Sequence, residues 1–204
     1  MSHPRFFLLF VLVLLTSTQT ASAERQCAVD AIKGKSVEIR SAGVWRPLTT
    51  TALPSGASRV RTGPRTRVKI TCNDSIVITI GGGTEVELSR LVGRSGRLFD
   101  AVLSLTDGIL GVSAPRRTWR RFEVRTPLAI ASVRSTDWIV SQADGATAVF
   151  VDIGRVRVSA SGRGAALDAG QGVDIRATDT TLSVKTWGAK RVSATKARLG
   201  FAWR

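Results

Sequence analysis

The stretch from Phe122 to Ile175 constrains the fold of this chain more than any other part of the sequence. It consists of short apolar or alternating runs, among them Phe122–Val124, Val149–Val151 and Val156–Val158. Turn-forming residues separate these runs at intervals of about eight to twelve residues, as at Asp144-Gly145 and Ala169-Gly170. Runs of this length are typical of stacked β-strands and are too short for helices of several turns. The pattern predicts an all-β fold.

Similar runs fill the N-terminal half, separated by glycine-rich or Asn/Asp-containing turns at residues 34, 41–43, 54–56, 73–75 and 81–83. We also expect a hairpin in which Leu98–Leu105 and Ile109–Val112 are joined through Asp107-Gly108. After Ile175 the pattern fades. We interpret residues 181–204 as a basic C-terminal tail, with a last strand and a short helix as candidates.

Residues 1–23 have the features of a secretory signal peptide. Arg5 gives a positive start, Phe6–Leu15 is an unbroken apolar run, and Ala21-Ser22-Ala23 is a small-residue cleavage site. The apolar run of ten residues is about half of what a membrane-spanning helix needs. We therefore expect cleavage between Ala23 and Glu24, and an exported protein with no integral membrane segment after removal of the signal.

The chain is strongly basic, with 30 Lys and Arg residues against 15 Asp and Glu residues. Such a charge attracts anionic glycans and lipids, but it is also compatible with arginines spread over solvated surfaces. Since the arginines are scattered and an exported protein rarely meets nucleic acid, we expect no nucleic-acid partner. The densest basic cluster surrounds a tryptophan and is a candidate partner surface; it comprises Arg116, Arg117, Trp119, Arg120 and Arg121.

The mature sequence carries little that could support catalysis. The single histidine, His3, lies in the signal peptide, and the chain has no tyrosine. This excludes Ser-His-Asp and Cys-His chemistry and removes the commonest transition-metal ligand. Asp137, Asp144 and Asp152 could in principle act as paired carboxylates or as calcium ligands, but two of the three stand at turn positions where Asp has a structural role. We predict no catalytic residue, no metal and no cofactor.

Two cysteines remain in the mature chain, Cys27 and Cys72. In an oxidising compartment this even count is compatible with a single disulfide. Two buried, unpaired thiols and a bond to a partner protein are the alternatives, because the sequence does not give the distance between the two side chains.

A series of short motifs follows in order along the chain. The motifs are Gly34-Lys35-Ser36-Val37, Gly43-Val44-Trp45-Arg46-Pro47-Leu48, Leu53-Pro54-Ser55-Gly56, Val60-Arg61-Thr62-Gly63, Val68-Lys69-Ile70, Asn73-Asp74-Ser75, Phe122-Glu123-Val124-Arg125-Thr126-Pro127, Val133-Arg134-Ser135-Thr136-Asp137-Trp138, Gly154-Arg155-Val156-Arg157-Val158 and Ala169-Gly170-Gln171. This series resembles the FecR domain, the periplasmic module of ferric-citrate-type signalling regulators. No one motif is specific, but their order spans nearly the whole mature chain. Three depart from the usual form, since one extra residue precedes Val37 and since Asp74 and Ser135 stand where glycine is common.

The resemblance implies a FecR-type β domain over residues 24–180, either a single β-solenoid-like or jelly-roll-like domain of short stacked strands or, as the alternative, a β-sandwich. It also implies a periplasmic or secreted location. In signalling relatives a cytoplasmic anti-sigma segment and a transmembrane helix precede this domain; here we expect an exported stand-alone form without them.

The function that follows is a non-catalytic protein-binding, signalling or sensing module of the bacterial envelope. It would dock on an envelope protein through strand edges and arginine-rich loops. The alternative is a structural module that binds an anionic envelope polymer, such as lipopolysaccharide or an acidic glycan, through its basic surface.

Overall fold

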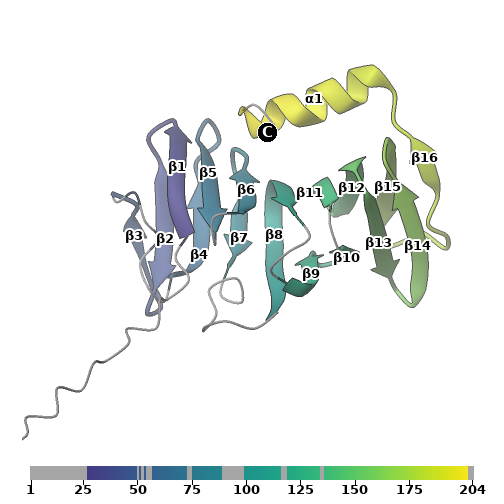
Figure 1. The fold of residues 1–204 in the computed structure, drawn as a ribbon, viewed down its shortest axis with the longest axis horizontal. Coiled ribbons are helices and arrows are strands. Elements are labelled where there is room, and N and C mark those ends of the chain that lie inside the picture. Colours follow the sequence, from purple (N-terminus) through teal and green to yellow (C-terminus); the bar gives the residue numbers. More distant parts are fainter. Residues whose placement is uncertain are drawn as a thin grey trace, which may run out of the picture.

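The computed structural model describes residues 27–49, 51, 53, 57–72, 75–88, 99–115, 119–133 and 136–201, without the side chains of residues 57, 58, 99, 100 and 119–121. The proposed signal peptide and its cleavage site at Ala23 and Glu24 lie outside the described residues. Within the described part the chain forms strands β1 to β16 and the helix α1 (Figure 1).

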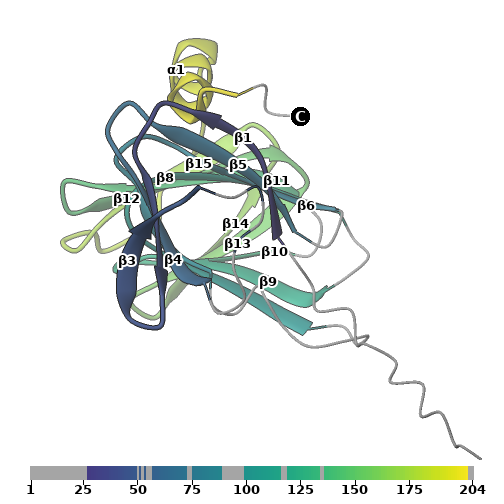
Figure 2. The same ribbon diagram turned by 90° about the vertical axis from the view of Figure 1, so that its left-hand side faces the viewer.

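The strands form two sheets that face each other, seen edge-on in Figure 2. One strand, β8 (Phe99–Ala114), belongs to both sheets. Sheet A contains, in spatial order, β1 (Cys27–Lys33), β5 (Arg67–Cys72), β6 (Ile76–Ile80), the second half of β8, β11 (Thr136–Ala143), β12 (Ala146–Ile153), β15 (Gln171–Arg176) and β16 (Val184–Thr186). Sheet B contains β3 (Val44–Pro47), β2 (Val37–Ser41), β4 (Ala57–Thr62), β7 (Glu85–Glu87), the first half of β8, β9 (Trp119–Arg125), β10 (Ile130–Val133), β13 (Arg155–Ala160) and β14 (Arg163–Asp168).

The expected hairpin around Asp107-Gly108 is wrong. Both halves belong to the continuous strand β8, which pairs with β7 and β9 before this point and with β6 and β11 after it. Gly108 lies where the strand passes from one sheet to the other, and its φ is +98°. A Cβ at this position would lie 2.2 Å from Thr84 Oγ1, so the crossing needs glycine.

Alternation along the strands places apolar side chains between the two sheets. In β5 the residues Val68, Ile70 and Cys72 are buried while their neighbours are half-exposed. In β13 the buried residues are Val156, Val158 and Ala160. Phe122 of sheet B meets Trp138 of sheet A edge-to-face, with ring centroids 5.3 Å apart. The shared interior therefore joins the two sheets into one core.

A second, smaller apolar cluster lies on the outer side of sheet A, beneath α1 (Ala189–Leu199) (Figure 2). Leu199 is fully buried against it. The C-terminal end of the helix is held by cations from sheet A: Arg67 Nε donates to the carbonyl of Arg198 at 3.0 Å and Lys33 Nζ to that of Gly200 at 2.5 Å. No helix among the described residues is long and apolar enough to cross a membrane.

Thr126 explains the Thr-Pro motif structurally. Its hydroxyl oxygen accepts hydrogen bonds from the N–H groups of Leu128 and Ala129, which closes the turn between β9 and β10. The same hydroxyl lies 2.8 Å from that of Thr147, which in turn donates to Gln142 in sheet A. This chain of hydrogen bonds links the two sheets.

The prediction of an all-β fold is confirmed. Among the described strands every pairing is antiparallel except β8 with β9. Residues 181–201, within the segment interpreted from sequence as a tail, contain β16 and α1.

Candidate protein-interaction surfaces

In the described part of the chain no helix covers the outer face of sheet B, whereas α1 covers part of the outer face of sheet A (Figure 2). At the β3 end this face carries Trp45 of β3 and charged side chains from the next three strands, β2, β4 and β7. The cross-strand register places Trp45 beside Arg40, Arg40 beside Arg59, and Arg59 beside Glu87. A second row runs from Glu38 through Arg61 to Glu85. Oppositely charged residues are therefore neighbours across much of this end of the sheet.

Trp45, Arg61 and Glu38 form a compact group, which we call the Trp45 cluster. The Arg61 guanidinium lies over the Trp45 ring at 4.4 Å from its centroid, and its Nε donates to Glu38 Oε2 at 2.7 Å. This hydrogen bond lowers the pKa of Glu38 below its ordinary value and raises that of Arg61. The arginine is thus held as a fixed cation beside a half-exposed indole.

The Trp45 cluster differs from the other motif side chains in its surroundings. Phe122 and Trp138 are buried in the interior, and Gln171 accepts a hydrogen bond from the backbone of Asp168. Those residues are explained by folding alone. Trp45 instead stands half-exposed on the outer face of the end strand β3, beside Arg40 of β2. Tryptophan and arginine are the residue types most enriched at the energetic centres of protein interfaces.

Basic residues on α1 form a second candidate surface. The helix carries four of them and no acidic residue. Two are engaged by sheet A: Arg191 bonds to Asp174 and lies over Trp187 at 3.5 Å, and Lys196 bonds to Asp152 at 2.7 Å. The others, Lys190 and Arg198, have exposed side chains.

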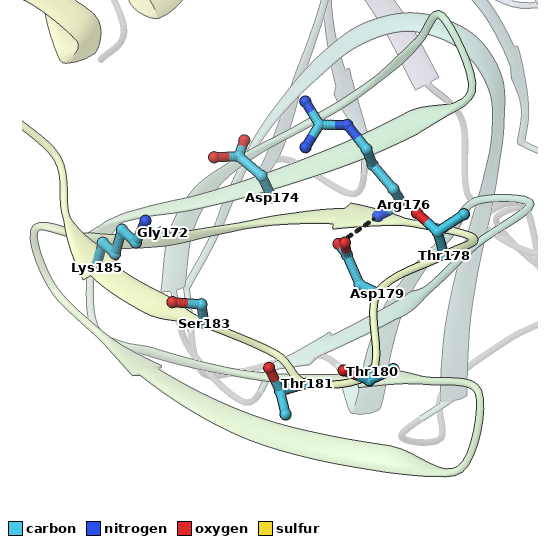
Figure 3. Close-up of a pocket in the computed structure, with 9 residues that line it drawn as sticks. All are labelled: Gly172, Asp174, Arg176, Thr178, Asp179, Thr180, Thr181, Ser183 and Lys185. Atoms are coloured by element: carbon cyan, nitrogen blue, oxygen red, sulfur yellow. Dashed lines mark hydrogen bonds between the residues drawn. The ribbon is translucent and has the colours of Figure 1, made fainter.

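A polar pocket of about 350 Å³ lies between β15 and the chain that leads into β16 (Figure 3). It is lined by hydroxyl-bearing and charged side chains, including Arg176, Asp179, Ser183 and Lys185. Asp179 is fixed in place, since its Oδ2 accepts the backbone N–H of Arg176 at 2.8 Å and its own N–H donates to the carbonyl of Arg176. The lining is matched to hydrophilic groups rather than to apolar ligands.

The structure places the remaining sequence-based candidates as follows. Cys27 and Cys72 are directly opposite each other on β1 and β5 and are joined by a disulfide. For the predicted basic cluster, Arg116 and Arg117 lie outside the described residues. Trp119, Arg120 and Arg121 are described only by their backbone, at the start of β9 beside β8.

Of the aspartates considered for catalysis, Asp137 and Asp152 lie at the same end of the β11–β12 pair, since Asp137 is opposite Ile153. Asp144 is in the turn between β11 and β12, with a φ of +50°, and Asp152 is paired with Lys196. Among the described residues no three His, Cys, Asp or Glu side chains are grouped in a way that could hold a metal ion. The sequence did not single out the Trp45 cluster as a site, although Trp45 and Arg61 both belong to motifs quoted for the resemblance.

Comparison with known proteins agrees with that resemblance. Residues 58–157 match the family described as FecR protein. Two crystal structures described as "a putative anti-sigma factor from Parabacteroides distasonis ATCC 8503" share the fold, each with a TM-score of 0.57 at 19% identity. The match covers 67% of this chain and 63% of that chain, so it spans less than two thirds of the relative's length. No curated protein matches the chain.

Proposed function

We propose that this chain, whose residues 58–157 match the FecR family, is a non-catalytic, protein-binding module for signalling or sensing in the bacterial envelope. The solved neighbour, described as a putative anti-sigma factor, supports a regulatory role that depends on protein partners. The sequence-based signal peptide and the disulfide between Cys27 and Cys72 support an exported, periplasmic or secreted location, where disulfides persist.

The observation that carries this proposal is the exposure of the Trp45 cluster. Keeping a tryptophan at the surface exposes apolar area that folding would otherwise bury. Here Arg61 stacks on the indole and Glu38 holds Arg61, so the group is pre-organised. A pre-organised aromatic and arginine pair loses little conformational entropy when a partner covers it. The proposed partner is an envelope protein that buries Trp45 at the centre of its contact.

Site-specific photo-crosslinking tests this proposal. A photoreactive amino acid is placed at position 40, because Arg40 is the direct cross-strand neighbour of Trp45 and shares its face of sheet B. Ile153, which is 43% exposed, serves as the control position. The mature chain is expressed in its own periplasm and irradiated. We expect one dominant crosslinked protein from position 40 that is absent from position 153 and disappears when Trp45→Ala is added. Equal products from both positions would contradict the proposal.

The alternative function is a structural module that binds an anionic envelope polymer, and the basic helix favours it as the second candidate. Lys190 and Arg198 project from a helix without acidic residues, in a chain with a formal net charge of +15. Binding of lipopolysaccharide or an acidic glycan would then fall steeply with added salt and would be weakened by Lys190→Glu with Arg198→Glu. If the partner is a protein that covers the Trp45 cluster, its affinity should fall with Trp45→Ala and should change little with these two charge reversals.

A further inference from the structure

The two sheets have four end strands among the described residues, and three of them are protected. The edge of β1 is covered by the chain at residues 51–53, because Val29 N–H donates to the carbonyl of Thr51 at 2.7 Å and Leu53 N–H to that of Cys27 at 2.9 Å. The end strand β3 contains Pro47, which has no N–H. The end strand β16 has only three residues. Covering, proline and shortness are the usual means of preventing strand addition.

The fourth end strand, β14, shows none of these protections. It has six residues from Arg163 to Asp168 and pairs with β13 without a bulge. It contains neither proline nor lysine. An edge of this length, without a bulge, is the kind that accepts another strand.

The hydrogen-bonding groups that face outward from β14 follow from its hairpin geometry. The two turn residues, Ser161 and Gly162, both have positive φ values, +47° and +77°. In such a two-residue turn the flanking pair is hydrogen-bonded, and the bonded pairs then alternate along the ladder. Residues 163, 165 and 167 therefore bond to β13, while the N–H and C=O groups of Gly164 and Ala166 point outward.

Asp168 supports this assignment, because its N–H donates to the side chain of Gln171 at 2.8 Å instead of to β13. Gly164 and Ala166 are both exposed. A Cβ at position 164 would meet only the carbonyl of Val158, at 3.9 Å. The edge is therefore accessible, and the small residues at these two positions leave room for the side chains of an added strand.

The charges beside this edge indicate the chemistry of the added strand. On β13, next to the edge, Arg155 is bonded to Asp168 at 2.5 Å. Arg157 has Ser132 and Ala166 as its direct cross-strand neighbours, so no acidic side chain stands opposite it. Arg163, at the start of the edge strand, lies on the opposite face and donates to the carbonyl of Asp179 at 3.2 Å. An incoming strand with acidic side chains on the outer face of sheet B would supply the counter-charge for Arg157.

A second copy of this chain is a poorer match. Each copy has a formal net charge of +15, and charge of this size and of one sign opposes self-association. We infer that the β14 edge binds an extended, acidic segment of a different protein as an added strand of sheet B. This site lies at the opposite end of sheet B from the Trp45 cluster and stands independently of it (Figure 1). A module with both sites would connect two binding partners.

The test uses a short synthetic peptide that alternates Glu and Thr, with a Lys-for-Glu peptide as the charge control. We expect the acidic peptide to bind the mature chain and the basic one not to bind, as measured by fluorescence anisotropy. Bound acidic peptide should slow amide exchange at Gly164 and Ala166. The variant Ala166→Pro removes one outward N–H without touching the ladder to β13, and should weaken binding by about tenfold. The matched variant Ala166→Ser keeps the N–H and should bind as the native chain does.

Thermal melting establishes whether Ala166→Pro is folded. If it is not folded, the native chain is titrated instead with acidic peptides that are N-methylated at every second residue. Methyl groups on the peptide N–H groups that face β14 should abolish binding, and methyl groups on the N–H groups that face away from β14 should not. Equal affinity for both peptides, or slowed exchange elsewhere but not at Gly164 and Ala166, would overturn the proposal. Self-association of the native chain that Ala166→Pro abolishes would assign the edge to a second copy and would also overturn it.

Discussion

Removal of the disulfide tests how the N-terminal strand is held to the sandwich. Cys27 begins β1, and its partner Cys72 ends β5, so the bond closes a loop with a sequence separation of 45 residues. In the chain-entropy model the crosslink restricts the unfolded chain by about 13 cal/mol/K for a loop of this length, or about 4 kcal/mol at 25 °C. Both cysteines are buried, so replacing them by alanine also removes apolar contacts.

We therefore expect the double variant Cys27→Ala with Cys72→Ala to lose about 4 kcal/mol of unfolding free energy. Urea denaturation of the native and variant chains measures this loss as a lower midpoint, with a somewhat steeper slope for the variant because its unfolded chain is no longer crosslinked and exposes more surface. Titration with a thiol reagent under denaturing, non-reducing conditions should find no free thiol in the exported native protein. The native chain treated with a reductant should shift its midpoint in the same direction as the double variant.

A loss below about 1 kcal/mol would refute the reasoning, because it would mean that the loop is already ordered in the unfolded state or that the bond strains the native one. Two reactive thiols in the exported protein would refute the disulfide itself. The backbone pairing of β1 with β5 continues over several residues beyond the cysteines, so the variant should still fold at low temperature.

Three further predictions concern the helix, the inter-sheet link and the surface cluster. Leu199→Ala should lower the unfolding free energy by about 3 kcal/mol, because the Leu199 side chain is fully buried. Arg198→Ala, at the exposed neighbouring position, should change the unfolding free energy by less than about 0.5 kcal/mol, and thermal and urea denaturation measure both variants. Thr126→Val should cost about 1–3 kcal/mol by leaving turn N–H groups without their acceptor, and the exposed Thr178→Val gives the baseline in the same assay. The carboxyl of Glu38 should titrate by NMR below its ordinary pKa, so its contribution to stability is present at neutral pH and is lost as the pH falls through the lowered value; an ordinary or raised pKa would contradict the bond to Arg61.

Many of the strands could be predicted because their signal depends only on residues that are close together in the sequence. Strands such as β5 and β13 alternate buried and exposed residues with a period of two, and alternation of this kind is visible without knowing any partner. Two-residue turns such as Asp144-Gly145 are equally local, since their positive φ values favour these residue types.

The crossing of β8 could not be predicted, because Asp107-Gly108 has the composition of a hairpin turn. What keeps the strand extended is non-local: Thr84 Oγ1 accepts the N–H of Ile109 at 3.0 Å, and β7 and β11 pair on either side of the crossing. The sequence indicates a short helix as a candidate in the C-terminal segment, but the contacts that hold α1 are also non-local: its buried residue Leu199 packs on sheet A, and cations on β1 and β5 hold its C-terminal end. Contacts between residues so distant in sequence leave no local pattern.

The Trp45 cluster shows the same limit for a site. The strand pattern around Trp45 places it in β3 but does not say which face it occupies, since a shift of one residue exchanges the two faces. The register with β2 decides this: Trp45 is opposite Arg40 on the outer face of sheet B, and Arg46 is opposite Ile39 on the inner face. Arg61, on β4, then reaches the indole through the pairing of β2 with β4.

The central claim is that the chain recognises a protein partner through the Trp45 cluster. Calorimetric titration of the crosslinked partner, once purified, with the native chain, Trp45→Ala and Trp45→Phe tests this most directly. We expect Trp45→Ala to weaken binding by about thirtyfold, as for a central interface tryptophan, while Trp45→Phe retains most of the affinity and all three chains melt at similar temperatures. Undiminished affinity of a folded Trp45→Ala chain, combined with binding that disappears on adding salt, would contradict the claim and favour the anionic polymer.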